Sequence, residues 1–159
     1  MEITAYIALG SNLGERAETL VSAVKQLNAV AGVCVRRLSN FIETEPVGPP
    51  DQPKYLNGAV EVRTTLTAER LLEELHRIED VLGRVRDPQN RWGPRTCDLD
   101  LLLYGQTVCR TPTLTLPHPQ IAERAFVLRP LAQIAPAVVH PVLGRTIAEL
   151  LAELECREG

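Results

Sequence analysis

Apolar residues recur with two different spacings along this chain, and the order in which the spacings alternate limits the folds available to it. Stretches typical of β-strands, apolar on one or both faces, occupy residues 3–9, 33–44, 55–62 and 97–104. Between the first two, residues 17–31 place apolar side chains three or four positions apart, which predicts an amphipathic helix. The chain is therefore expected to alternate strand and helix from its start.

A second helix is predicted between the third and fourth strands. Thr67 is suited to cap its start and Gly83 to end it. Its buried stripe consists of Leu71, Leu75, Ile78 and Leu82. The order β-α-β-β-α-β is that of an α+β, ferredoxin-like sheet with two helices packed on one face. The remaining residues are predicted to form short proline-bounded pieces and a final helix over 146–154, a C-terminal extension of a single domain spanning residues 1–159.

Three segments carry turn or loop signals. Residues 10–14, Gly-Ser-Asn-Leu-Gly, are predicted to form a turn, since no Gly-Lys-Ser/Thr follows to make a P-loop. Residues 45–53 hold four prolines, which remove backbone donors and predict a stiff loop. Residues 84–96 are polar and rich in arginine, and are also predicted to be a loop.

Net charge and targeting signals narrow the class of protein. The formal net charge is −3, which disfavours electrostatic binding to nucleic acid or to a membrane surface. The start, Met-Glu-Ile-Thr, lacks the basic residues and apolar run of a signal peptide, and charges or prolines interrupt every long apolar run. The four cysteines have no metal-ligand spacing and are expected to be reduced. We expect a cytoplasmic, monomeric protein.

The strongest chemical signal is the pair Asp98 and Asp100 at the start of an apolar strand. The two-residue period of a strand places both carboxylates on one face, with Cα atoms about 6–7 Å apart. Because like charges at that spacing repel, a cation is expected beside them. Three interpretations remain open: a metal ion, neutralising arginines, or a solvated sheet edge.

A second signal lies just upstream, where four arginines and the single tryptophan fall within twelve positions. They are Arg84, Arg86, Arg91, Trp92 and Arg95. A solvated loop would explain them, but guanidinium groups next to paired carboxylates are also what a polyphosphate requires. Oxygen ligands with phosphate nearby favour Mg²⁺ over zinc. Together the two signals predict a site for a nucleoside triphosphate.

The histidines are weaker candidates. His118 lies between two prolines and is followed by Arg124, so both could sit on a turn near a ligand. A lone histidine of this kind is more often structural. His76 falls on the second helix away from its leucine stripe, and His140 precedes a proline; both have a structural interpretation.

Three segments together resemble one known family. Tyr6–Gly14, Asp51–Asn57 and Arg91–Asp100, in that order and spacing, are similar to the 6-hydroxymethyl-7,8-dihydropterin pyrophosphokinases of folate biosynthesis. The resemblance runs from about residue 4 to residue 136 and includes Pro117-His118 and Arg124–Phe126. It implies transfer of the pyrophosphoryl group of ATP to the pterin hydroxymethyl oxygen, giving the pterin diphosphate and AMP.

The resemblance also implies roles for individual residues. Asp98 and Asp100 would hold two Mg²⁺ ions. A catalytic loop would comprise Arg84, Arg86, Arg91, Trp92 and Arg95. The ATP site would include this loop and also His76, Glu79, Leu101, His118 and Arg124. The pterin pocket would be lined by Thr44, Val47, Tyr55, Asn57 and Phe126. A flat bicyclic pterin favours aromatic stacking with a few amide groups, which this last set supplies.

Some positions depart from the family pattern, and two other functions stay open. His76 stands where a glutamine is common, Pro119 replaces an aromatic residue, and Glu45 replaces a proline. A nucleotidyltransferase is the alternative enzyme, and it would release pyrophosphate instead of AMP. An RNA-binding module is the non-enzymatic alternative, although aromatic residues make up just 4% of the chain.

Overall fold

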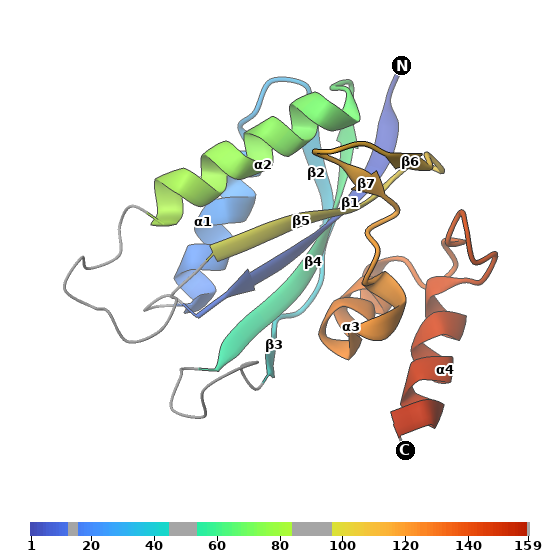
Figure 1. Ribbon diagram of the computed structural model, residues 1–159. Helices are drawn as coiled ribbons and strands as arrows, with labels where there is room; N and C mark the ends of the chain where they lie inside the picture. The colour runs from blue at the N-terminus through green and yellow to red at the C-terminus, as the bar shows by residue number, and fades with distance from the viewer. Residues whose placement is uncertain (13–15, 45–53, 84–96, 159) are drawn as a thin grey trace.

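The fold is an antiparallel sheet covered by helices on both faces, in a computed structural model that describes residues 1–12, 16–44, 54–83 and 97–158. The main sheet has the order β2-β4-β1-β5, with β3 also paired to β4. Its strands are β1 (Ile3–Ser11), β2 (Val33–Leu38), β3 (Ile42–Thr44), β4 (Tyr55–Thr64) and β5 (Cys97–Tyr104). Because β1 and β4 lie in the middle, residues from both meet at the centre of the sheet (Figure 1).

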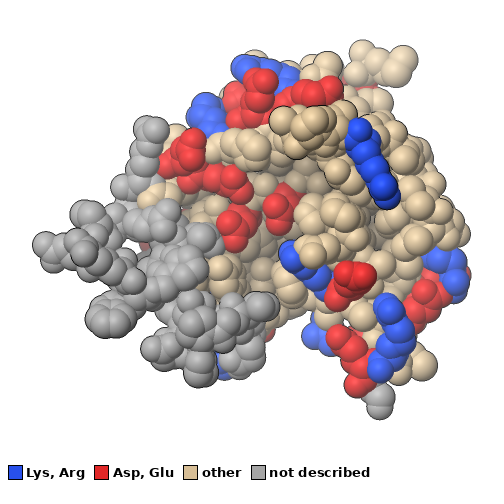
Figure 2. Space-filling view, viewed as in Figure 1, with Lys and Arg blue, Asp and Glu red and all other residues tan. Residues whose placement is uncertain are grey.

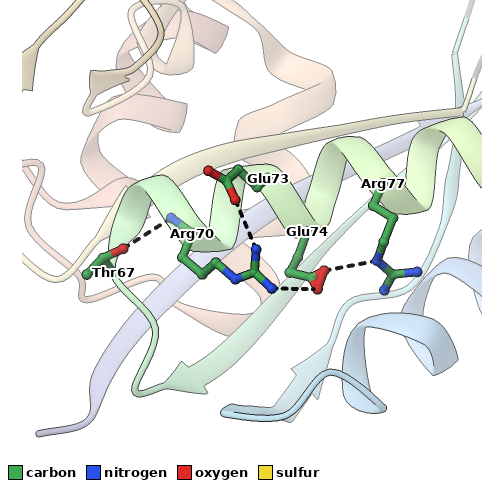
Figure 3. Close-up of polar contacts among 5 residues, drawn as sticks. All are labelled: Thr67, Arg70, Glu73, Glu74 and Arg77. Carbon is green, nitrogen blue, oxygen red and sulfur yellow. Dashed lines mark hydrogen bonds and ion pairs between the residues drawn. The ribbon is translucent and has the colours of Figure 1, made fainter.

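One face of the sheet is covered by α1 (Arg16–Asn28) and α2 (Ala68–Gly83) (Figure 1). The predicted stripe of α2 is buried as expected, and Leu20, Ala23 and Leu27 of α1 join it in the same core. The side-chain hydroxyl of Thr67 accepts a hydrogen bond from the Arg70 N–H at 3.1 Å, which caps α2 (Figure 3). Both helices on one face were therefore predicted, although α1 ends at Asn28, three residues before the predicted end.

The opposite face is covered by α3 (Ala125–Ile134), preceded by η1 (Ile121–Glu123), and α4 (Ile147–Glu158) packs against α3 and η1 (Figure 1). Helix α3, which contains Pro130, was missed in the sequence, where this region was predicted to form short proline-bounded pieces. Its buried side chains pack on the sheet and outweigh the hydrogen bond that proline cannot donate. Helix α4 runs to Glu158, four residues past the predicted end.

The start of α4 matches the prediction because it carries a reciprocal cap. The Thr146 N–H donates to Glu149 Oε1 at 2.8 Å, and the Glu149 N–H donates to Thr146 Oγ1 at 3.1 Å. Two short strands, β6 (Cys109–Arg110) and β7 (Thr115–Leu116), pair between β5 and η1. No helix in the described part of the chain is long and apolar enough to cross a membrane.

Two predictions about strand ends were wrong. Gly10 and Ser11 belong to β1, not to a turn, because both pair with β4 and β5 on either side. The predicted strand 33–44 is divided into β2 and β3, and between them the Ser39 hydroxyl takes the place of a backbone acceptor for the Ala59 N–H at 2.8 Å. The predicted loops 45–53 and 84–96 lie outside the described residues.

Candidate active site

A cavity of about 310 Å³ opens on the α3 face of the sheet, where β1, β4 and β5 meet the start of α3. This volume lies within the range of small-molecule sites. Figure 2 shows acidic side chains gathered over α2 and β5 beside a hollow in the surface. The cavity is lined by Ala8, Leu9, Gly10, Thr44, Tyr55, Asn57, Asp98, Asp100, Arg124, Phe126 and Val127.

Gly10 forms the centre of the cavity floor. It pairs with Asn57 of β4 on one side and with Asp98 of β5 on the other. A β-carbon at this position would lie 2.9 Å from the Asn57 side-chain oxygen, so a larger residue would displace that amide. The Asn57 amide Nδ2 donates to the Thr44 hydroxyl at 2.6 Å, which leaves its orientation fixed from β3.

Asp98 and Asp100 lie on the cavity face of β5, as the two-residue period predicted. Both are partly exposed, whereas Cys97 and Leu99 are buried on the other face. Burial raises the pKa of the Cys97 thiol to about 12, so this thiol stays protonated.

Glu79 of α2 lies against the backbone of this aspartate pair. Its Oε2 accepts a hydrogen bond from the Leu99 N–H at 2.7 Å. Burial raises the pKa of Glu79, with Asp98 and Asp100 adding to the rise and the Leu99 hydrogen bond opposing it. Asp98 and Asp100 thus lie close enough to Glu79 to raise its pKa, and positive charge at this end of β5 would relieve the repulsion among the carboxylates.

Arg124 and Phe126 enter the cavity from the start of α3. The Arg124 guanidinium lies over the Phe126 ring, 5.5 Å from its centroid. Both side chains are partly exposed and line the same cavity as Asp98 and Asp100. The guanidinium therefore connects an aromatic half of the cavity with an acidic half.

His118 is half-buried near β5, and its backbone N–H donates to the Leu102 carbonyl at 2.9 Å. Burial lowers the pKa of His118, and its Nδ1 accepts a hydrogen bond from the Gln120 N–H at 3.2 Å. A neutral ring that accepts at Nδ1 carries its proton on Nε2, and His118 does not itself line the cavity.

The other predicted nucleotide residues are placed differently. His76 is exposed on α2 and does not line the cavity. The Leu101 side chain is 3% exposed in the α1–α2 core, so a ligand could reach this residue through its main chain but not through its side chain. Residues Arg84, Arg86, Arg91, Trp92 and Arg95, as well as Val47, lie outside the described residues.

Four cavity residues were missed in the sequence: Ala8, Leu9, Gly10 and Val127. A glycine at the end of a strand often marks the close approach of another group, and this signal could have identified Gly10. Ala8, Leu9 and Val127 carry no polar group that would distinguish them from core residues. Among the described residues, no cluster of three or more His, Cys, Asp or Glu side chains could hold a metal ion.

Comparison with known proteins gives a consistent family. The family model for 7,8-dihydro-6-hydroxymethylpterin-pyrophosphokinase (HPPK) matches residues 6–136. The chain is 44% identical over 152 residues to the 2-amino-4-hydroxy-6-hydroxymethyldihydropteridine pyrophosphokinase of Synechocystis sp., covering 96% of this chain and 76% of the relative. It is 49% identical over 138 residues to the Bacillus subtilis protein of the same name, covering 87% and 81%.

A solved structure supports the fold. A Plasmodium falciparum HPPK-DHPS, wild type with pteroate, superposes with a TM-score of 0.78 at 14% sequence identity. The superposition covers 99% of this chain but 43% of the solved one, so the chain spans less than half of that protein. At this identity the likeness concerns the fold alone.

Proposed function

The chain belongs to the 7,8-dihydro-6-hydroxymethylpterin-pyrophosphokinase family, and we propose that its α3-face cavity is where the two substrates of that reaction meet. The enzyme transfers the pyrophosphoryl group of ATP to hydroxymethyldihydropterin in folate biosynthesis. One observation carries the proposal: predicted pterin residues and both predicted metal ligands, from separate segments of the chain, line one cavity.

The pterin binds in the aromatic half of the cavity. Tyr55 and Phe126 provide flat apolar surfaces for the bicyclic ring, and Asn57 provides an amide for its polar edge. The Thr44 hydroxyl holds the Asn57 amide, so the donor and acceptor of that amide are oriented before the ligand arrives. Val47, outside the described residues, is proposed to complete this half.

The acidic half suits Mg²⁺. Two partly exposed carboxylates, Asp98 and Asp100, lie on one face of β5, and a third, Glu79, is engaged by a backbone N–H. Magnesium is commonly bound by one or two carboxylates together with substrate phosphates, so two aspartates fit it without a larger protein cluster. We assign two Mg²⁺ ions to Asp98 and Asp100. When bound, the metal would neutralise phosphate charge as the pyrophosphoryl group is transferred.

The nucleotide lies on the Arg124 side of the cavity, next to His118, which does not line the cavity but interacts electrostatically with Asp100 and Arg124. The Arg124 guanidinium can pair with phosphate oxygens, and Nε2–H of His118 can donate to the nucleotide. Glu79, His76 and Leu101 remain proposed contacts, the last through its main chain. The arginines and tryptophan of residues 84–96 are proposed to supply further positive charge and stacking.

We also propose a ferredoxin-like topology for the sheet and its helices. A ferredoxin-like topology is supported by the sheet order β2-β4-β1-β5, all antiparallel, with α1 and α2 on one face. We propose that residues 1–159 form one pyrophosphokinase domain that acts as a monomer on small molecules, without nucleic acid or a membrane. Both hydrophobic clusters pack on the same sheet, as expected of one domain.

The products of the reaction test the function. Purified protein with ATP, Mg²⁺ and 6-hydroxymethyl-7,8-dihydropterin should release AMP and form the pterin diphosphate in equal amounts. Release of free pyrophosphate would instead support the nucleotidyltransferase alternative. The same assay with Asn57→Ala and Asp100→Asn tests the cavity, because the first should raise KM for the pterin and the second should lower kcat.

A further inference from the structure

Arg16, the first residue of α1, joins two segments that are distant in the chain. Its guanidinium donates to Glu43 Oε2 in β3 at 2.7 Å and to the Lys54 carbonyl, next to β4, also at 2.7 Å. Glu43 and Lys54 flank residues 45–53 on either side. One side chain thus contacts both strands of the β3–β4 pair at the end where Thr44 pairs with Tyr55.

This contact joins separate segments of the chain at the surface, where the Glu43 side chain is 47% exposed and its Oε1 also lies 3.9 Å from Lys54 Nζ. The positive end of a helix dipole lies at its first turn, so an arginine at the first position of α1 is placed unfavourably. The Glu43 carboxylate offsets that cost, and the hydrogen bond from Arg16 is the main reason that the pKa of Glu43 is lowered. The Arg16 side chain is 28% exposed, whereas that of Arg70 in α2 is 58% exposed.

The joined segments carry cavity residues at the next position in each case. Thr44 follows Glu43, and Tyr55 follows Lys54; the two are paired across β3 and β4. Thr44 also accepts the hydrogen bond from Asn57. A shift of either strand end would therefore displace a stacking surface and loosen the amide of the pterin half.

We propose that Arg16 is a positioning residue for pterin binding, acting through Glu43 and Lys54 to hold Thr44 and Tyr55 at the cavity. Arg16 does not itself line the cavity, so it is not a catalytic residue. This inference rests on the proposed function, in that the cavity must be the pterin site. It assigns the effect to pterin affinity and leaves nucleotide affinity and the chemical step unchanged.

Calorimetry with the pterin substrate, in saturating non-hydrolysable ATP analogue and Mg²⁺, provides the test. Arg16→Ala should raise the pterin Kd roughly three- to tenfold, between the effects of an exposed ion pair and of a charge-assisted hydrogen bond. Arg16→Lys should recover a part of this, because one ammonium can keep the Glu43 pair without the planar fork. Steady-state assays should show a raised KM for pterin with kcat and KM for ATP within about twofold of wild type.

Two further variants make the result decisive. Arg70→Ala is the matched control, since Arg70 also contacts two acceptors, Glu73 and Glu74, but within one helix and away from the cavity (Figure 3). It should leave the pterin Kd unchanged. Asn57→Ala reports on the cavity itself and should weaken pterin binding independently of Arg16.

The outcomes separate the inference from the proposed function. If Asn57→Ala weakens pterin binding and folded Arg16→Ala does not, the role of Arg16 is wrong and the cavity assignment stands. If neither variant changes the pterin Kd, the cavity assignment fails and the inference fails with it. A lower Tm for Arg16→Ala with an unchanged Kd would likewise overturn it, by showing a structural role alone.

Discussion

The two faces of the sheet differ in what fills them. On the α1–α2 face, apolar side chains from β1, β2, β4, β5 and β7 and from the two helices form a continuous core. On the α3 face, apolar packing covers the end of β5 near Leu102 and Leu103, and the other end opens into the cavity with Asp98 and Asp100. The same strand is therefore a core element at one end and a site at the other.

Because the two faces differ in this way, substitutions on them should affect different properties of the protein. Removing a buried methyl group leaves a void in a closed core and lowers stability. Two like charges on the open face instead repel one another, and a bound cation relieves that repulsion. Substitutions on the α1–α2 face should therefore change the free energy of unfolding, and substitutions in the cavity should change ligand binding and turnover.

The largest expected effect is on catalysis. Asp100→Asn should lower kcat by about a thousandfold, because charge stabilisation at a transferring phosphate is typically worth several kcal/mol. Steady-state AMP release measures the loss. In EDTA its Tm should equal or slightly exceed that of wild type, since one of two repelling carboxylates is removed. A clear loss of Tm in EDTA would show that Asp100 is a structural ion-pair partner.

The core face should give the reverse result. Leu75→Ala removes a side chain that is 0% exposed in α2 and should lower the free energy of unfolding by about 3 kcal/mol. Pterin and nucleotide affinities of the folded variant should stay within twofold of wild type. Leu128→Ala, equally buried in α3, should lose similar stability but also weaken pterin binding, because α3 carries Phe126. Urea unfolding measures the loss of stability in both variants, and calorimetry measures their pterin affinity. Equal pterin affinities in the two variants would contradict the difference between the two faces.

An aromatic substitution sharpens the contrast further. Phe126→Ala should weaken pterin binding by about 1–3 kcal/mol, the usual contribution of a buried aromatic surface. Phe41, the other phenylalanine of the chain, packs against the α1–α2 core and supplies the matched control. Calorimetry should find pterin affinity unchanged in Phe41→Leu. If Phe126→Ala binds the pterin as tightly as Phe41→Leu does, Phe126 is not part of the pocket.

The smallest expected effect is on the free energy of unfolding at low pH. His140 is 6% exposed, and its Nδ1 accepts hydrogen bonds from the N–H groups of Val142 and Leu143 at 3.2 and 3.0 Å. Burial lowers the pKa of His140, so below about pH 6.5 the unfolded chain takes up a proton that the folded chain resists. Stability should therefore fall as pH is lowered from 7 to 5, by less than about 1.4 kcal/mol per pH unit for one proton.

Urea midpoints at pH 7, 6 and 5 measure this slope. His140→Gln should flatten it, because the substituted side chain does not titrate. An unchanged slope in the variant would assign the acid sensitivity to other groups.

The two faces of the sheet also differ in how well their helices could be predicted from the sequence. Helix α2 was predicted at both ends because its cap, its stripe and its terminal glycine all agree. Helix α3 was not, because Pro130 gives a local signal that tertiary packing overrides. Contacts that decide packing between distant segments leave no local pattern in a sequence.

The candidate site was predictable where chemistry is visible in residue types. The face shared by Asp98 and Asp100 follows from strand geometry alone. The assignment of Tyr55, Asn57 and Phe126 to one pocket required resemblance to a family, since more than sixty positions separate the last two. The role of Gly10 depends on the side chain of a neighbouring strand, which local spacing does not reveal.

The burial of Cys97 has a practical consequence for labelling. A thiol with a pKa of about 12 is almost wholly protonated at neutral pH, and maleimides react with the thiolate. Cys34 and Cys156 are exposed, on β2 and α4. With Cys109, which is partly exposed, and one of these two replaced, a fluorophore could be attached to the other while the cysteine beside Asp98 stays unmodified, as a means of following substrate binding by energy transfer.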